Sequence, residues 1–177
     1  MKPTFKNREN KSYKVEDKEI WVSRSPATVA IIFGIYKGEV YVLLEKRSET
    51  MRDYPGRYCL ICGYLDWDET GYEGVIRETY EEAGLYLPDF KFKNNNKGQP
   101  FFVNTSPTEN LQNVALHYCF IIDFLNELPN VGNYENNEIE KVEWVLTKDI
   151  KKYDLAFNHY TRIKQAIKKH KDILELK

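Results

Sequence analysis

The chain has 177 residues, of which 42% are hydrophobic and 30% are charged, so it can form one domain with a sizeable core. Its 26 basic and 27 acidic residues are mixed along the chain, and we expect neither nucleic acid nor an anionic membrane as a partner. No apolar run reaches the roughly 20 residues of a membrane span, and the N-terminal segment lacks the apolar centre of a secretory signal. These features predict a cytoplasmic protein.

The three cysteines are too few for a disulfide framework, which agrees with a reducing compartment. Cys59 and Cys62 form a C-x-x-C pair, and His117 with Cys119 adds two more side chains of the kind that bind zinc. The alternative is that both segments are strands whose small thiols fill the core. Because side chains three positions apart on a flat strand diverge, we favour the core role and leave zinc binding open.

Strands predominate in the pattern of apolar and β-branched residues. Residues 1–18 are polar and predict a poorly ordered N-terminal extension, followed by a single domain at 19–177. A tight turn is expected at Lys37-Gly38. Strands are predicted at 19–23, 27–36, 39–47, 58–61, 90–95, 113–124 and 140–146.

Two helices accompany these strands. The first is predicted at 70–84, with Gly84 suited to end it, and the second lies within 157–176. The apolar stripe of the first helix is expected to contain Ile76, Thr79, Tyr80 and Ala83. A mixed sheet flanked by two helices belongs to the α+β class.

The stretch at 63–85, GYLDWDETGYEGVIRETYEEAGL, is crowded with carboxylates. Glu78, Glu81 and Glu82 fall within about a 100° arc of the predicted helix, where like charges repel. Hard cations such as Mg²⁺ and Mn²⁺ take oxygen ligands, so we predict that these three glutamates bind one of these metals. Arg77 lies one turn from both Glu73 and Glu81, and we expect it to orient carboxylates rather than contact substrate.

This stretch resembles the Nudix box, G-x5-E-x7-R-E-U-x-E-E-x-G-U, where U is an aliphatic residue. Thr79 stands at one aliphatic position, and Ile61-Cys62 replaces the Pro-Gly that many members carry before the box. The flanking strands resemble the family's order over most of 19–146, which implies a Nudix α/β/α sandwich. The residues that match the box are Gly63, Glu69, Arg77, Glu78, Glu81, Glu82, Gly84 and Leu85.

The resemblance implies hydrolysis of a diphosphate linkage in a nucleoside diphosphate joined to another group X, with Mg²⁺ or Mn²⁺ as cofactor. Such chemistry requires charge neutralisation and in-line positioning, which a metal site provides. The substrate is then a small-molecule nucleoside diphosphate derivative. The alternative is a non-catalytic family member that binds a nucleotide as a sensor or regulator. Family members are often dimers, so the resemblance also implies a homodimer as one possible state of the protein.

The resemblance implies a general base that is either a box glutamate, for which we choose Glu81, or a carboxylate from a later loop. In that loop Glu138 best matches the position at which many members carry a glutamate, and we prefer it to Glu140. Together with Arg77, these glutamates are the predicted catalytic residues.

Three partial motifs leave the group X open. LLEKRSETMRDYPGRYCLICG follows the spacing of the coenzyme A motif, GQPFFVNTS follows the reduced-NAD motif in part, and Pro100 lies where ADP-ribose hydrolases carry a proline. Nucleoside triphosphates and nucleotide sugars stay open as well. We predict that Arg47 and Arg52 contact phosphate and that Gly63 lines the substrate site, while surface ion pairs are the alternative role for the two arginines.

Overall fold

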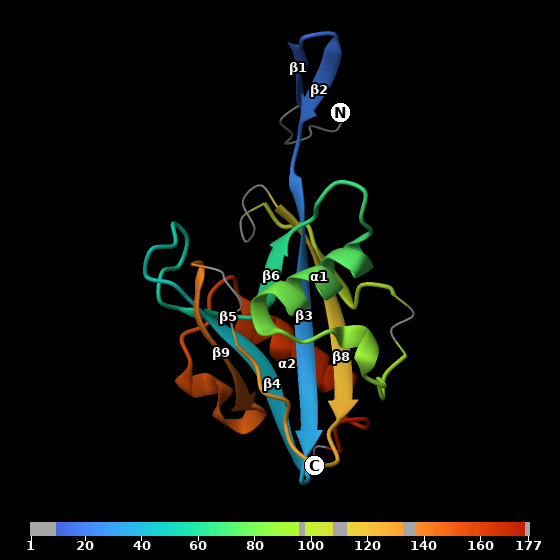
Figure 1. Cartoon of the computed structure of the whole chain (residues 1–177), viewed down its shortest axis with the longest axis vertical. Helices are drawn as coiled ribbons and strands as arrows, with labels where there is room; N and C mark the ends of the chain where they lie inside the picture. Colours follow the sequence, from blue (N-terminus) through green and yellow to red (C-terminus); the bar gives the residue numbers. More distant parts are fainter. Residues whose placement is uncertain (1–9, 96–97, 108–112, 133–136, 176–177) are drawn as a thin grey trace, which may run out of the picture.

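The computed structural model describes residues 10–95, 98–107, 113–132 and 137–175. Its centre is a seven-stranded mixed sheet with the order β5-β4-β3-β8-β7, in which β6 also pairs with β3 and β9 with β4 (Figure 1). The strands of this sheet are β3 (Ser25–Tyr36), β4 (Glu39–Arg47), β5 (Tyr58–Cys59), β6 (Ile61–Tyr64), β7 (Phe102–Asn104), β8 (Asn113–Asp123) and β9 (Ile139–Leu146).

Among the described residues, the domain also contains two α-helices and two 3₁₀ segments: α1 (Gly71–Ala83), η1 (Leu87–Asp89), η2 (Thr147–Lys152) and α2 (His159–Lys169). In the described part of the chain, no helix combines the length and the apolarity needed to cross a membrane.

The alternation of side chains along β3 explains the layered arrangement. Val29, Ile31 and Phe33 point to one face, where they pack in a core that includes Ile163 and Ala166 of α2. The residues between them point to the other face and pack in a second core with Val75 and Ala83 of α1. The sheet is therefore covered by one helix on each side, and the predicted α/β/α sandwich of the α+β class is confirmed.

The predicted turn between β3 and β4 is also confirmed. Lys37 and Gly38 have φ angles of 50° and 75°, both left-handed, as a two-residue hairpin turn requires. On the other side of β3, strand β8 runs parallel to it over eleven residue pairs. This parallel pair places the start of β8 beside the start of β3, near β6 and the cavity described below.

Helix α1 begins and ends as its sequence predicts, but its buried stripe differs. Thr70 caps the helix together with Glu73, and Gly84 ends it with a φ of 71°. The apolar stripe consists of Val75, Thr79 and Ala83, whereas Tyr80 is exposed and Ile76 is half-buried. Thr79 fills an aliphatic position at little cost because its hydroxyl donates to the carbonyl oxygen of Val75 at 2.7 Å.

Some predicted elements were wrong. Residues 11–18 lie largely in strands rather than in a poorly ordered extension, because β1 (Lys11–Val15) pairs with β2 (Lys18–Val22) in a hairpin that projects from the domain (Figure 1). Residues 1–9 of the predicted extension lie outside the described part. The boundary at residue 18 itself stays a prediction.

Residues 90–95 form no strand beyond one bridge between Phe92 and Ile122. Here the side chain of Asn94 replaces backbone pairing, as it donates to the carbonyl oxygen of Cys119 and accepts from the amide of Ile121. The C-terminal helix ends at Lys169, earlier than the apolar spacing suggested.

Candidate functional site

The box helix lies unusually close to β6, and Gly63 allows this approach. A methyl group on Gly63 would overlap with the carboxylate of Glu78. Gly74 has the same effect on the loop before α1, since a Cβ there would lie 2.9 Å from both Leu65 Cδ1 and Glu69 Oε1. These two glycines therefore let α1 and the loop before it pack closely on β6, which brings the carboxylates of Glu69 and Glu78 into one region.

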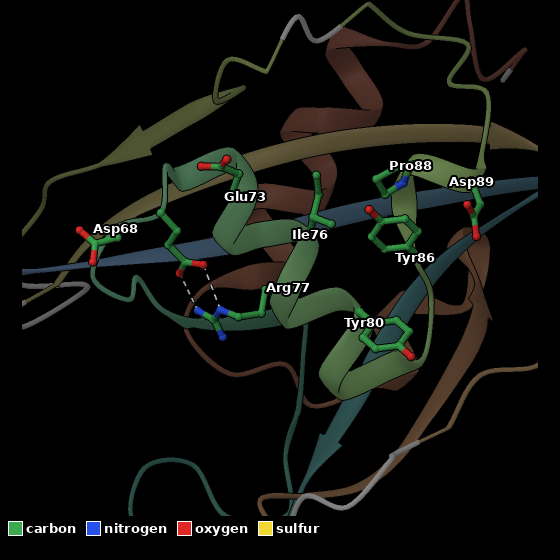
Figure 2. Close-up of a pocket in the computed structure, with 9 residues that line it drawn as sticks. Asp68, Glu73, Ile76, Arg77, Tyr80, Tyr86, Pro88 and Asp89 are labelled. Carbon is green, nitrogen blue, oxygen red and sulfur yellow. Dashed lines mark hydrogen bonds and ion pairs between the residues drawn. The ribbon is translucent and has the colours of Figure 1, made fainter.

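Arg77 is the centre of an ion-pair network on α1. Its Nη2 and Nε atoms donate to the two oxygens of Glu69 at 2.7 and 3.0 Å, which is the fork geometry of a strong guanidinium–carboxylate pair (Figure 2). The hydrogen bonds from Arg77 hold the pKa of the Glu69 carboxyl below its usual value. Nη2 also donates to the carbonyl oxygen of Tyr64 at 3.0 Å, which ties α1 to the end of β6. Glu73 is not a partner, contrary to the prediction, because its carboxylate accepts from Thr70.

The remaining nitrogen of Arg77 holds two of the predicted metal ligands. Nη1 donates to Glu78 at 2.8 Å and to Glu81 at 2.9 Å, as the spacing predicted for Glu81. The Glu78 side chain is buried, and this burial raises its pKa even though Arg77 lowers it. The Glu81 side chain is 53% exposed. Arg77 thus contacts one carboxylate from the loop and two carboxylates that lie about one helical turn apart on α1.

Glu82 is turned into the core rather than toward Arg77. It is only 6% exposed, and its carboxylate accepts from the backbone amide of Cys62 at 3.3 Å. It also lies against the carboxyl of Glu45 on β4, and sequence reasoning missed this neighbour. Burial followed by the charge of its partner raises the pKa of Glu82, and burial raises the pKa of Glu45 to about 8. The signal for Glu45 was a carboxylate in the otherwise apolar run EVYVLLEKR.

The donor set of the box suits a hard divalent cation. Glu78, Glu81 and Glu82 do not bring three oxygens within 4.8 Å of one another in the structure, since Arg77 holds the first two and Glu82 is turned inward. Burial nevertheless raises the pKa values of Glu78 and Glu82, and the negative charges of neighbouring carboxylates raise them further. A cation such as Mg²⁺ or Mn²⁺ would neutralise these charges, and carboxylate oxygens are its preferred ligands.

A cavity of about 230 Å³ lies on the opposite face of β6 from α1, on the side of α2. Two of the predicted site residues are in its wall and one is at its edge: Gly63 and the buried Arg47 line it, and the exposed Glu138 lies beside them. The other residues that line the cavity are Ala27, Val29, Met51, Asp53, Cys62, Tyr64, Asn113, Ala115, His117, Phe157 and His159.

Contacts fix most of the predicted loop residues in place. Arg47 donates to the carbonyl oxygen of Asp53 at 2.9 Å, and its guanidinium lies 5.1 Å from the centre of the Phe157 ring. The backbone oxygen of Glu138 accepts from the amide of Ser48 at 2.7 Å, whereas Glu140 forms an ion pair with Lys46 at 2.6 Å. Arg52 is exposed and does not line this cavity.

Two buried histidines form part of the cavity wall, and sequence reasoning did not assign them to it. Their rings lie 6.3 Å apart, and burial lowers the pKa of both, that of His117 to about 4. The Nδ1 atom of His159 accepts from the backbone amide of Leu60 at 3.0 Å. The neutral ring of His159 therefore carries its proton on Nε2. The clue in the sequence was FNHY just before an amphipathic segment, which is a weak signal.

The expectation that Cys59 and Cys62 diverge was wrong. The strand is interrupted at Leu60, so that β5 pairs with β4 while β6 pairs with β3, and the two thiols come together beside Glu45. His117 and Cys119 do not join this group of ligand atoms in the described part of the chain. A four-residue zinc site of Cys59, Cys62, His117 and Cys119 is therefore not formed.

The outer side of α1 carries a second, shallower pocket of about 800 Å³ (Figure 2). Arg77 and Glu73 come from the helix, whereas Tyr86, Pro88 and Asp89 follow it. The rings of Tyr80 and Tyr86 meet edge to face at 6.2 Å. This pocket was not predicted, because the segment after α1 folds back to close it, and helical spacing alone does not place that segment.

The comparison with known proteins agrees with the box. A family model described as NUDIX domain matches residues 24–166, and the chain belongs to the Nudix hydrolase family. A 68-residue segment is 40% identical to the peroxisomal coenzyme A diphosphatase 1 of Saccharomyces cerevisiae. This segment covers 37% of the chain and only 20% of the yeast protein.

Two solved structures illustrate the shared fold. The NUDIX domain of Shewanella oneidensis NrtR, complexed with ADP ribose, superposes with a TM-score of 0.62 at 20% identity, over 84% of this chain and 89% of that one. A bifunctional NMN adenylyltransferase/ADP ribose pyrophosphatase from Francisella tularensis, complexed with AMP and a Mn ion, gives 0.65 at 17% identity. That superposition covers 82% of this chain and 42% of the Francisella chain.

Proposed function

We propose that the protein hydrolyses the diphosphate linkage of a small-molecule nucleoside diphosphate derivative, with Mg²⁺ or Mn²⁺ held by Glu78, Glu81 and Glu82. The observation that carries this proposal is the arrangement of buried, charge-crowded carboxylates of the box helix against Gly63, which also lines the cavity on the other face of β6. Family membership supports the reaction class. The Mn ion named with the Francisella structure supports the choice of cation.

The bound cation would neutralise the negative charge of the diphosphate. Arg77 keeps Glu78 and Glu81 in position through one nitrogen and anchors itself to Glu69 through the other two. Glu138 lies at the cavity, from which a carboxylate can take a proton from the attacking water. Glu81 is the alternative base, since its side chain is the exposed one of the three box carboxylates.

The cavity would receive the part of the substrate next to the diphosphate. Arg47 is the phosphate contact that its wall offers, while Arg52 would reach a phosphate only from the exposed loop. A coenzyme A derivative is the first substrate to test, because the yeast relative is named a coenzyme A diphosphatase and the sequence before the box follows the coenzyme A motif in part.

A panel of substrates tests this proposal. The purified chain is incubated with coenzyme A, NADH, ADP-ribose, nucleoside triphosphates and nucleotide sugars in Mg²⁺ or Mn²⁺, and products are identified by mass spectrometry. Glu82→Gln keeps the shape and removes a charge, so its kcat should fall by roughly 10²-fold or more. If the wild type binds these compounds but hydrolyses none of them, the protein is a sensor or regulator instead.

Location and assembly are part of the same proposal. We infer a cytoplasmic protein from the three free thiols, although the yeast relative is named peroxisomal.

A homodimer is supported by the projecting hairpin β1–β2, on which Trp21 is 63% exposed beside Ile20 and Val22. Light scattering after size-exclusion chromatography measures the mass, and a monomer that stays monomeric at high concentration would contradict the dimer.

A further inference from the structure

A second group of ligand atoms lies in the core, and it contains two thiols. The carboxylate of Glu45 and the thiols of Cys59 and Cys62 offer atoms that all lie within 4.8 Å of one another. Glu45 on β4 is the direct cross-strand partner of Cys59 on β5, while Cys62 comes from β6 after the break at Leu60. Three strands thus aim three metal-binding groups at one point.

The group is incompletely satisfied by hydrogen bonds. Glu45 is 1% exposed, and its Oε1 atom accepts from the Cys59 thiol at 2.9 Å. Its Oε2 atom has no hydrogen-bond partner among the described residues. A buried carboxyl oxygen without a partner is costly, and a cation between the ligand atoms would remove that cost.

Glu82 lies next to this group, but its oxygens are not within 4.8 Å of all three ligand atoms, so it would have to move closer to act as a fourth ligand. Its carboxyl lies against that of Glu45, and its Oε2 atom accepts from the amide of Cys62. Two sulfurs with carboxylate oxygens favour Zn²⁺ and exclude Mg²⁺, which takes oxygen ligands. In a tetrahedral zinc site the ligand atoms lie about 3.3–3.8 Å apart, so the observed group needs only small side-chain movements.

We propose that Glu45, Cys59 and Cys62 bind one Zn²⁺ ion, with Glu82 as the fourth ligand. The two thiols and the paired carboxyls of Glu45 and Glu82 release the protons that they carry to solvent as the ion binds. The ion reaches the site through the cavity, since Cys62 is half-buried and lines its wall next to Gly63.

One consequence rests on the proposed function. Glu82 belongs to both sites, so zinc in the thiol site withdraws a ligand from the Mg²⁺ or Mn²⁺ site on α1. Zinc should then inhibit hydrolysis, and Mg²⁺ in excess should not restore it. The zinc site itself does not depend on any hydrolytic activity.

Cobalt titration tests the site directly. The full chain is reduced, stripped with a chelator and titrated with Co²⁺, whose bonds to thiolates give a charge-transfer absorption in the near ultraviolet. We expect this band to saturate at one ion per chain and to disappear when Zn²⁺ is added. A wild-type chain without the band would overturn the proposal.

Matched variants locate the ion. Cys59→Ser and Cys62→Ser should each reduce the thiolate band and weaken zinc binding by roughly 100-fold or more, as should Glu45→Gln. Cys119→Ser removes a buried thiol outside the group and should leave the band unchanged, and so should Glu81→Gln. A band that survives both Cys59→Ser and Cys62→Ser contradicts the proposal, as does one that depends on Cys119.

A measurement on the wild type tests the site even if the variants do not fold. Cys62 is the one half-buried thiol of the three, so iodoacetamide should label it first in the metal-free chain. Stoichiometric Zn²⁺ should slow this labelling at least tenfold. Labelling of Cys62 at an unchanged rate with zinc present would overturn the proposal.

Discussion

A single backbone hydrogen bond determines how His159 can interact with a ligand. Its Nδ1 atom accepts from the amide of Leu60, and burial keeps the ring neutral near pH 7. The proton on Nε2 therefore makes His159 a fixed donor in a cavity whose wall also contains Phe157, 5.4 Å from the histidine ring. A flat ligand group with an acceptor atom matches this wall, whatever the group X is.

Two substitutions separate the two nitrogens of His159. In His159→Asn the amide oxygen can replace Nδ1 as the acceptor for Leu60, but the donor at Nε2 is lost. We expect KM to rise about tenfold, equivalent to one hydrogen bond, with stability nearly unchanged. His159→Gln can keep a donor near Nε2 but leaves the amide of Leu60 unpaired, so it should lower the free energy of unfolding by about 1–3 kcal/mol. The opposite pattern in steady-state kinetics and urea unfolding would show that the ring has the other tautomer.

The buried pair of Glu45 and Glu82 makes a prediction about stability and pH. Burial raises the pKa of Glu45 to about 8 in the folded state, against an ordinary value of 4.5, so the folded state retains a proton that the unfolded state loses. This contribution to stability is fully present below pH 4.5 and is lost as the pH rises through 8. The Tm of the metal-free chain should therefore fall by several degrees between pH 5 and pH 8.

Glu45→Gln is the control for this effect, because a neutral amide of the same shape has no proton to lose. Its Tm should change less over the same range, and Mn²⁺ should stabilise the wild type more at pH 8 than at pH 5. Equal slopes for the wild type and Glu45→Gln in a calorimetric pH series would show that other groups cause the dependence.

At the scale of elements, the contact between β6 and α1 is set by the absence of one side chain. Gly63→Ala would push its methyl group into the carboxylate of Glu78, which Arg77 holds from the other side. A displacement of about 1 Å in a catalytic group can cost 10²-fold in rate, and we expect kcat to fall on that scale. Gly132→Ala is the matched control, since a Cβ there meets no atom within 4 Å, and it should be neutral. An active Gly63→Ala would show that Glu78 has room to move.

The local sequence pattern was enough to predict most of these elements. It failed where residues far away in the chain determine which structure a segment adopts. The capping pair Thr70 and Glu73, with Gly84 at the other end, fixes α1 from its own sequence. No local pattern shows that Asn94 replaces strand pairing at β8, or that the strand through Leu60 breaks because each half pairs with a different neighbour. The same holds for the site. The box predicted the carboxylates on α1, whereas Glu45 lies 37 residues before Glu82 in the chain and His159 lies 77 residues after it.

At the scale of the whole molecule, the cavity lies where parts far apart in the sequence meet. The start of β8 supplies Asn113, the segment before α2 supplies Phe157, and the loop before β9 supplies Glu138. This last loop is fastened to the loop after β4 by the hydrogen bond from the amide of Ser48 to the carbonyl oxygen of Glu138. The backbone at Glu138 is thus fixed, while its side chain lies at the mouth of the cavity.

Glu138 and Glu140 are two residues apart but lie in different surroundings, which makes them a matched pair. If Glu138 is the general base, Glu138→Gln should lower kcat by about 10²- to 10⁴-fold with metal affinity nearly intact, and raising the pH should partly restore activity as hydroxide replaces the base. Glu140→Gln removes only a surface ion pair with Lys46 and should change neither kcat nor KM by more than about twofold. Pre-steady-state kinetics and metal titration of both variants measure these quantities. Full activity in Glu138→Gln would transfer the role of the base to Glu81, whose exposed carboxylate is then the next one to replace.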